Sequence, residues 1–179
     1  RKKMHRILLT LLISTISYSG IAQIDSTQFV TTWDTRLPGA SDSLSIYFPT
    51  SLNVSVPYNF DIDWNNDGVF DTLGVTSNTG LLHTYPNAGI YTVRVRGTFP
   101  AIKFNNRLDR NKITSIDQWG TGVWESMDAA YSGCSNLTYN ATDAPNLLGS
   151  VDCYQMFLGA SSFDGDLSNW DASKINNMG

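Results

Sequence analysis

The chain has 179 residues, of which 41% are hydrophobic and 16% charged, and its formal net charge is −4 at pH 7. This apolar content excludes a chain that is disordered by composition. Four of the twelve basic residues lie within the first six positions, which leaves eight basic against sixteen acidic residues in the rest of the chain. So acidic a remainder excludes a general nucleic-acid binder, because phosphate neutralisation requires clustered Lys and Arg.

The first 22 residues have the three parts of a secretory signal peptide. A basic start, Arg1–Arg6, precedes an apolar core, Ile7–Ile13, and the small residues before Gln23 form a cleavage site after Ala22. The apolar run is short for a membrane span. We therefore expect an exported chain with no membrane span after cleavage. The alternative is an uncleaved N-terminal anchor.

Residues 23–99 are expected to form a small antiparallel β-sandwich. Apolar and polar residues alternate in four short runs, which is typical of strands with one buried face. Turn-forming Pro, Gly, Asn and Asp residues separate the runs. The alternating residues are Leu44, Ile46 and Phe48; Val54, Val56 and Tyr58; Phe60, Ile62 and Trp64; and Tyr91, Val93 and Val95. Short strands joined by polar turns indicate a sandwich.

Two segments of this part resemble PKD domains. Residues 60–68 are similar to their W-D-x-G-D-G hairpin, with residues inserted after Trp64, and residues 83–93 follow their H-x-Y-x-x-x-G-x-Y-x-V ending. The resemblance implies an immunoglobulin-like sandwich of the kind that serves surface proteins as a spacer or as a protein- or glycan-contacting module. His83 stands in the second motif, and we expect it to be a hydrogen-bonded structural residue.

The loop after Trp64 has the spacing of a calcium site. Hard oxygen ligands stand at positions 1, 3, 5 and 9 of an EF-hand-like loop, with Gly68 at position 6. Position 12 is Gly74 instead of a bidentate Glu, and the loop follows a strand and not a helix. The candidate ligands are Asp63, Asn65, Asp67 and Asp71. The alternative is a hairpin turn in which these side chains bond their own backbone.

Six basic residues gather next to the end of the sandwich. Such a cluster is either a solvated ridge that balances nearby carboxylates or a patch for an anionic ligand, and charge runs favour the ridge. The six are Arg94, Arg96, Lys103, Arg107, Arg110 and Lys112.

From about residue 119 the sequence repeats itself every 25 or 26 residues, which is typical of stacked repeats. Residues four apart in each unit predict a short inward-facing helix, and a glycine ends it. The aligned residues are Met127, Cys153 and Met178; Tyr131 and Phe157; and Gly133 and Gly159. Residues 100–118 are expected to form an atypical first repeat. Cys134 and Cys153 occupy apolar repeat positions, which favours buried thiols over a disulfide, although an exported chain permits a disulfide.

Residues 151–178 resemble the leucine-rich repeats of the BspA-like surface protein family, the mycoplasma lipoprotein-associated type, whose unit reads V-T-D-M-x-x-M-F-x-G-A-x-x-F-N-x-D-L-S-x-W-D-V-S-x-V-T-x-M. The departures are conservative, with Cys153 for Met, Ala172 for Val and Ile175 for Val. The expected fold class is therefore mainly β with α/β repeats. A PKD-like β-sandwich over residues 23–99 would be followed by the start of a leucine-rich-repeat solenoid over residues 100–179.

No catalytic or cofactor motif is present. The chain has one histidine after position 22 and no nucleophile elbow, phosphate loop or zinc-ligand spacing. We therefore expect no enzyme activity and no cofactor. The BspA-like resemblance implies a secreted or cell-surface bacterial protein, monomeric, that adheres to proteins or glycans on host, matrix or other cells. The alternatives are a structural spacer or stalk, and a non-catalytic appendage of a larger secreted hydrolase.

Overall fold

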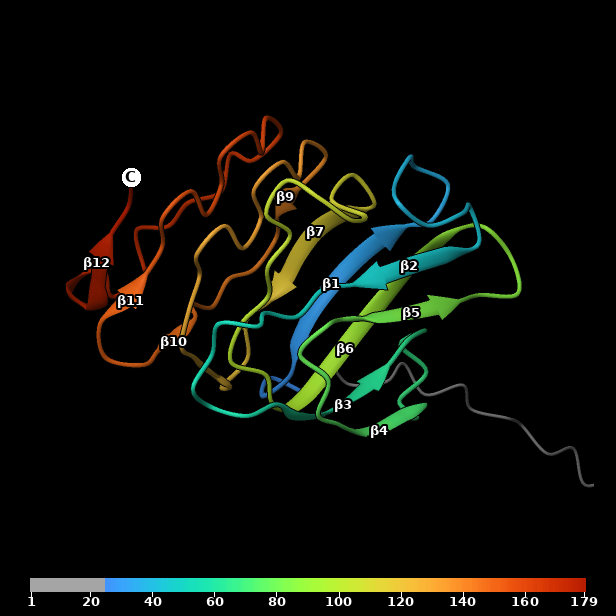
Figure 1. Ribbon diagram of the computed structural model, residues 1–179, viewed down its shortest axis with the longest axis horizontal. Coiled ribbons are helices and arrows are strands. Elements are labelled where there is room, and N and C mark those ends of the chain that lie inside the picture. Colours follow the sequence, from blue (N-terminus) through green and yellow to red (C-terminus); the bar gives the residue numbers. More distant parts are fainter. Residues whose placement is uncertain (1–24) are drawn as a thin grey trace, which may run out of the picture.

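The computed structural model describes residues 25–179, and nearly all of its regular structure is β-strand (Figure 1). The predicted signal peptide and its cleavage site lie outside the described residues. Within residues 25–179, no helix has the length and apolarity to span a bilayer. The strands are β1 (Phe29–Asp34), β2 (Ser45–Phe48), β3 (Asn59–Asp63), β4 (Thr72–Val75), β5 (Leu81–Thr84), β6 (Ile90–Thr98), β7 (Ile113–Gln118), β8 (Val123–Trp124), β9 (Thr138–Tyr139), β10 (Asn146–Leu147), β11 (Val151–Asp152) and β12 (Ile175–Asn177). One 3₁₀ turn, η1 (Ala172–Lys174), precedes β12. The prediction of a mainly β fold is confirmed.

The first half of the chain forms two sheets that face each other. Strands β4, β3, β6 and β1 lie in that order in the larger sheet, and β2 pairs with β5 in the smaller one. Aromatic rings fill the space between them: the ring centroid of Phe48 on β2 lies 5.7 Å from that of Trp33 on β1 and 5.6 Å from that of Phe99, which follows β6. The alternating runs at 44–48, 60–64 and 91–95 therefore predicted strands β2, β3 and β6.

The strand predicted over residues 54–58 is wrong, because this segment is a loop. Pro57 has no N–H to complete a ladder. The N–H groups of Ser55 and Val56 instead donate to the carboxylate of Glu125, at 2.7 and 2.8 Å. The segment thus ties the sandwich to the second half of the chain. The alternation of apolar and polar residues in the sequence did not indicate strands β1, β4 and β5.

The two predicted parts of the chain share one sheet and one hydrophobic core. Strand β7 pairs antiparallel with β1 and parallel with β9, so the larger sheet has the order β4-β3-β6-β1-β7-β9. Trp119 and Trp124, from the second half, contact Phe29 of β1 with ring centroids 5.8 and 4.9 Å apart. The boundary between residues 99 and 100 stays a prediction, and packing is continuous across it.

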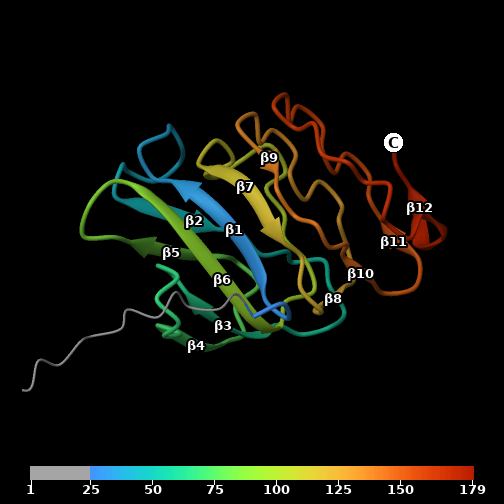
Figure 2. The same ribbon diagram turned by 180° about the vertical axis from the view of Figure 1, so that it is seen from behind.

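Beyond β7 the successive repeats lie side by side (Figures 1 and 2). Their short strands pair in parallel, β8 with β10 and β11 with β12. Paired residues lie about one repeat apart, as Asp152 does with Asn177. Residues 100–118 take part in this stacking, because the N–H of Phe104 donates to the carbonyl of Ala130 at 3.1 Å. This pairing joins each repeat to its neighbour, as stacked repeats require.

The short helix predicted in each repeat is wrong. Residues 127–133 and 153–159 form consecutive tight turns, and Ala129 and Gln155 have φ angles of +48° and +51°, which a right-handed helix does not accept. The amides are directed at the next repeat: the N–H groups of Met127, Ala129, Tyr131 and Gly133 donate to the carbonyls of Asp152, Tyr154, Met156 and Leu158. Because these amides bond between repeats, they cannot form a helix within one. The α half of the expected fold class is therefore corrected.

Tyr139 of β9 holds two tryptophans together inside the stack. Its hydroxyl accepts a hydrogen bond from the indole N–H of Trp119 at 2.9 Å and from that of Trp170 at 3.3 Å. The two indole rings lie edge to face, 5.4 Å apart. Trp119 is fully buried, so its N–H has no access to water and depends on this hydroxyl.

The substitution Tyr139→Phe should therefore destabilise the fold by about 1–3 kcal/mol, the usual cost of leaving a buried donor without a partner. Urea unfolding, followed by circular dichroism, measures this loss. Tyr154→Phe is the matched control, because its exposed hydroxyl contacts only Gln155, at 3.1 Å. Equal losses in the two variants would contradict the role assigned to Tyr139.

Candidate binding groove

Of the four candidate calcium ligands, Asp63 is the last residue of β3 and the other three lie in the turn that follows, which their hydrogen bonds close. Asp63 is fully buried and accepts from the N–H groups of Asn66 at 2.7 Å and Gly68 at 3.0 Å. Similar bonds run from Trp64 N–H to Asp71, from Asp67 N–H to Asn65 and from Val69 N–H to Asp67. Gly68 has a φ of +87°. Within residues 25–179 no three His, Cys, Asp or Glu side chains converge as metal ligands. These contacts are those of the hairpin-turn alternative, and the calcium site stays a prediction.

His83 of β5 lies against two aromatic rings. Its imidazole stacks on Trp64, with centroids 4.3 Å apart and planes 7° apart, and meets Tyr85 edge to face. Burial lowers its pKa, and the nearby carboxylate of Asp71 opposes that shift. The contacts give His83 a structural role through stacking, where the sequence had suggested hydrogen bonding.

The six clustered basic residues are separated by the fold. Arg96 pairs with Asp61 across β6 and β3 at 2.9 Å, and Lys103 pairs with Asp128. Arg94 is buried in the larger sheet. Two of the six thus balance carboxylates, as the ridge alternative predicted.

Lys112 is fully buried, which the charge pattern had not indicated. Its ammonium group donates to the backbone carbonyls of Ser41 at 3.1 Å and Ser45 at 2.8 Å, and to the Ser41 hydroxyl at 2.8 Å. Burial lowers its pKa, while the carboxylates of Asp109 and Asp42 oppose the shift. Lys112 therefore anchors the segment before β7 to the loop before β2 and is not available to a ligand.

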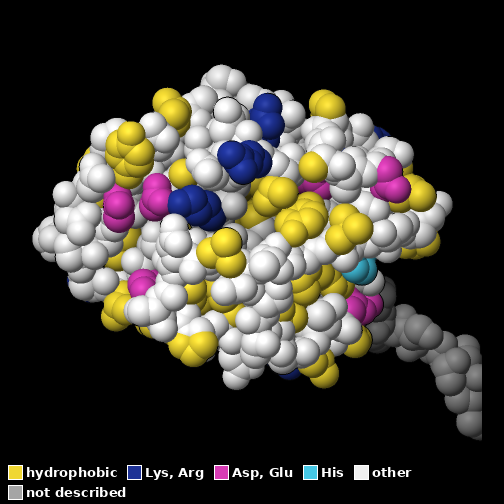
Figure 3. All heavy atoms as spheres, viewed as in Figure 1, with side chains coloured by type: hydrophobic (Ala, Val, Ile, Leu, Met, Phe, Trp, Pro, Cys, Tyr) yellow, Lys and Arg dark blue, Asp and Glu magenta, His cyan; other side chains and the backbone are white. Residues whose placement is uncertain are grey.

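Arg107 and Arg110 remain, and neither forms an ion pair with a carboxylate of residues 25–179. Asp109 stands between them in the sequence but is fully buried. It accepts from Ser41 N–H at 2.9 Å and from Tyr47 N–H at 2.5 Å. The carboxylate nearest in sequence is thus directed away from both arginines. Figure 3 shows separate Lys and Arg side chains above and to the left of the centre of this face, with acidic side chains beside one of them.

The two arginines line a polar groove of about 620 Å³ over the turns of the repeats. A second hollow of about 320 Å³, next to the loop at residues 50–53, shares Asn105 and Arg107 with it. We call the two together the junction groove. Besides the arginines, the polar side chains of the larger hollow are Asn105, Asn106, Asn111, Ser132, Ser135 and Gln155. The smaller hollow adds Thr50, Ser51, Asn53 and Lys103.

Gly133 and Gly159 form the floor of the junction groove. Both have positive φ angles, and they lie against each other in successive repeats. A Cβ atom on Gly133 would come within 2.6 Å of the Arg110 Cδ, so only glycine allows Arg110 to lie on this turn. The sequence analysis predicted this glycine only as the end of a helix. Because it has no side chain, it leaves the space above the turn open and so forms the base of the groove.

The amide residues of the junction groove were missed by the sequence analysis. Asn105 and Asn106 adopt positive φ angles of 48° and 55°, a conformation that Asn tolerates better than most residues. The Asn-Asn pair itself was the available signal, because adjacent Asn residues favour turns. Their position opposite Gln155 depends on stacking of the repeats and could not be seen in the sequence.

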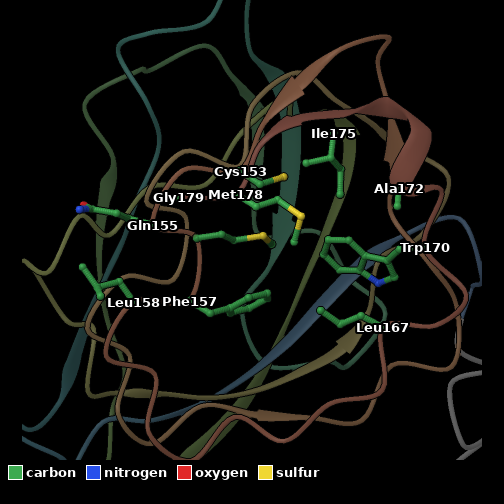
Figure 4. Close-up of a pocket in the computed structure, with 11 residues that line it drawn as sticks. Cys153, Gln155, Phe157, Leu158, Leu167, Trp170, Ala172, Ile175, Met178 and Gly179 are labelled. Carbon is green, nitrogen blue, oxygen red and sulfur yellow. The ribbon is translucent and has the colours of Figure 1, made fainter.

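A second, apolar hollow of about 350 Å³ lies at the last repeat (Figure 4). Figure 4 shows Phe157, Leu167, Trp170 and Met178 around it, while Gln155 points away. In the preceding repeat the aligned Tyr131 is covered by Phe157, with the rings stacked 5.7 Å apart. The hollow is thus the face that each earlier repeat presents to its neighbour. We assign it to packing between repeats.

Both cysteines are buried and neither forms a disulfide. Burial raises the pKa of Cys134 well above its usual range and that of Cys153 to about 11. A thiol with a raised pKa is a poor nucleophile. The predicted burial is confirmed, and the thiols serve as apolar core groups.

Comparison with known proteins finds a match for the second half of the chain. Residues 100–179 match a protein family. The family is described as "Mycoplasma protein of unknown function, DUF285". The match covers the repeats and the larger hollow of the junction groove but not the sandwich or the loop at residues 50–53, and its description assigns no activity. No curated protein and no solved structure matches the chain.

The substitution Asp63→Asn should lower the free energy of unfolding by about 1–3 kcal/mol, because an amide cannot accept all the N–H bonds of the carboxylate. Urea unfolding with calcium chloride or with EDTA measures this, and the hairpin-turn alternative predicts no difference between the two solutions. Asp164→Asn, an exposed carboxyl, is the control. A calcium-dependent gain in the unchanged chain that Asp63→Asn abolishes would establish the metal site instead.

Stability should fall between pH 7 and pH 5.5 because of His83. Its pKa is lowered in the folded chain, so the unfolded chain takes up the proton first as the pH drops below about 6.5. The hydrogen-bonded carboxylates of Asp34 and Asp61, whose pKa values are also lowered, lose their contribution only near and below about pH 4. Thermal melting of the chain and of His83→Phe, which keeps the ring on Trp64, tests the assignment. Parallel pH dependence in both would rule it out.

Proposed function

We propose that the chain belongs to a secreted or cell-surface bacterial protein that binds other proteins and has no catalytic role of its own. The observation that carries this proposal is the junction groove, where Arg107 and Arg110 lie on hydrogen-bonded repeats without a carboxylate partner from the described part of the chain. An arginine without an ion pair indicates a binding surface better than a paired one does, because a nearby carboxylate already balances the charge of a paired arginine. The similarity of residues 100–179 to a mycoplasma family supports a bacterial origin.

The finer architecture belongs to the same proposal. The two facing sheets of residues 29–98 and the sequence motifs around Trp64 and His83 support a PKD-like, immunoglobulin-like sandwich. Parallel pairing at about the repeat length supports a BspA-like leucine-rich-repeat solenoid. Proteins built this way display one continuous surface along the stack, which suits adhesion to proteins or glycans on host, matrix or other cells. We propose a monomer that is exported by cleavage after Ala22.

A structural spacer is the second candidate. The continuous larger sheet from β4 to β9 and the shared core favour it, because they join the two halves without a flexible linker. A spacer needs no unpaired arginines, so the junction groove favours the binding role. The chain as an appendage of a secreted hydrolase would place any catalysis in another domain.

Binding of the purified chain to immobilised extracellular-matrix and host-surface proteins, measured by biolayer interferometry, tests the proposal. We expect saturable binding to at least one of them with a dissociation constant in the micromolar range, which is typical of a modest polar interface. Antibody labelling of intact and permeabilised cells tests the location in parallel. A folded chain that binds none of these proteins, or that is labelled only after permeabilisation, would contradict the binding role or the location respectively.

A further inference from the structure

We propose that the junction groove takes an extended acidic segment of a partner protein, whose carboxylate is held by Arg107 and Arg110. This inference rests on the proposed binding function and names the chemistry of the partner. It depends on the arrangement of charge, amide groups and apolar side chains around the two arginines.

The two guanidinium groups are free to bind an anion because the neighbouring carboxylates are occupied. Asp109 bonds Ser41 and Tyr47 on the other side of the segment, and Asp128 bonds Lys103. Both arginines line the larger hollow of the groove, and an external carboxylate would supply the counter-charge that they lack. Guanidinium also offers a planar pair of donors that matches the two oxygens of a carboxylate.

The remaining lining groups fit the backbone of a peptide. The carboxamides of Asn105 and Asn106 each offer a donor and an acceptor, as a peptide bond requires. Asn111 already accepts from the Ser135 hydroxyl at 3.2 Å, and Gln155 donates to the Tyr154 hydroxyl at 3.1 Å. An exposed leucine lines each of the two hollows, Leu52 the smaller and Leu158 the larger, with 68% and 57% of the residue accessible. A segment with a central Asp or Glu and apolar residues on either side therefore has a partner for each of its groups.

The same features disfavour a sulfated glycan. Sugar rings commonly stack on exposed aromatic side chains, and the one aromatic residue that lines the junction groove, Phe104, is buried within the described structure. The chain after position 6 carries eight basic against sixteen acidic residues, so a polyanion would be repelled outside the two arginines. A ligand with one or two carboxylates is attracted by the two arginines and extends little negative charge over the acidic surface around them.

The site is held in shape before a ligand arrives. Asn106 N–H donates to the Ser132 carbonyl at 2.9 Å, and Arg107 N–H donates to the Phe104 carbonyl at 3.0 Å. Lys112 and Asp109 fix the following residues to the loop before β2. Binding therefore requires little backbone ordering, which would otherwise oppose affinity.

The test uses a fluorescein-labelled ten-residue peptide with Leu-Glu-Asp-Leu at its centre, and the same peptide with Gln and Asn in place of the acids. Fluorescence anisotropy should give at least tenfold tighter binding of the acidic peptide. Arg107→Gln and Arg110→Gln should each weaken it about tenfold, since a hydrogen bond to a charged group contributes about 1.5–3 kcal/mol before solvent screening. Arg36→Gln, an exposed arginine of the sandwich outside the groove, should leave it unchanged.

Equal binding of the two peptides, or unchanged binding by both groove variants, would overturn the inference. Tighter binding of low-molecular-weight heparin with the same arginine dependence would replace the peptide with a glycan. Binding to a matrix or host protein that survives Arg107→Gln and Arg110→Gln would overturn the inference and leave the proposed function standing. Circular dichroism of each variant ensures that a loss of binding is not a loss of fold.

Discussion

Strand β7 is hydrogen-bonded along both edges, and the rest of the structure depends on that arrangement. On one side it pairs antiparallel with β1, and on the other it pairs parallel with β9. An edge strand with free N–H and C=O groups is a site of unwanted pairing. Here the edge of the sandwich sheet is covered by the start of the stack, and the stack begins on an ordered strand. The pairing also fixes the direction in which the repeats extend from the sandwich.

The segment that leads into β7 is fixed by buried charge. Lys112 and Asp109 are both fully buried, and removing an ion from water costs several kcal/mol unless its hydrogen bonds are replaced. Each finds those bonds in the loop before β2, around Ser41. Such a network has one satisfied geometry, so it holds the backbone of residues 109–112 in place. Arg107 and Arg110 are positioned as a consequence, since they lie on or beside this fixed segment.

The sequence predicted the elements whose pattern is local. Alternation identified β2, β3 and β6, and the repeat length predicted that the later units stack on one another. The helix in each repeat failed because Met127 and Tyr131, four positions apart, face the core equally well in a chain of tight turns. The positive φ at Ala129 carries no mark in the sequence, since alanine favours helices. The predicted strand at residues 54–58 does not form for a different reason. The N–H groups of Ser55 and Val56 donate to the carboxylate of Glu125, a residue far along the chain, and not to a neighbouring strand.

The candidate site could be predicted only in part for the same physical reason. Clustering of Lys and Arg in the sequence identified the right segment, but the fold pairs Arg96 and Lys103 with carboxylates and buries Arg94 and Lys112. Which cations remain available depends on where Asp109 and Asp128 point, and that is decided by packing of β2 and of the repeats. A binding surface of this kind consists of the charged side chains that have no partner within the folded protein. An exposed arginine without a partner costs the fold little free energy, because water solvates its charge. Its attraction to a ligand's carboxylate strengthens when binding removes that water.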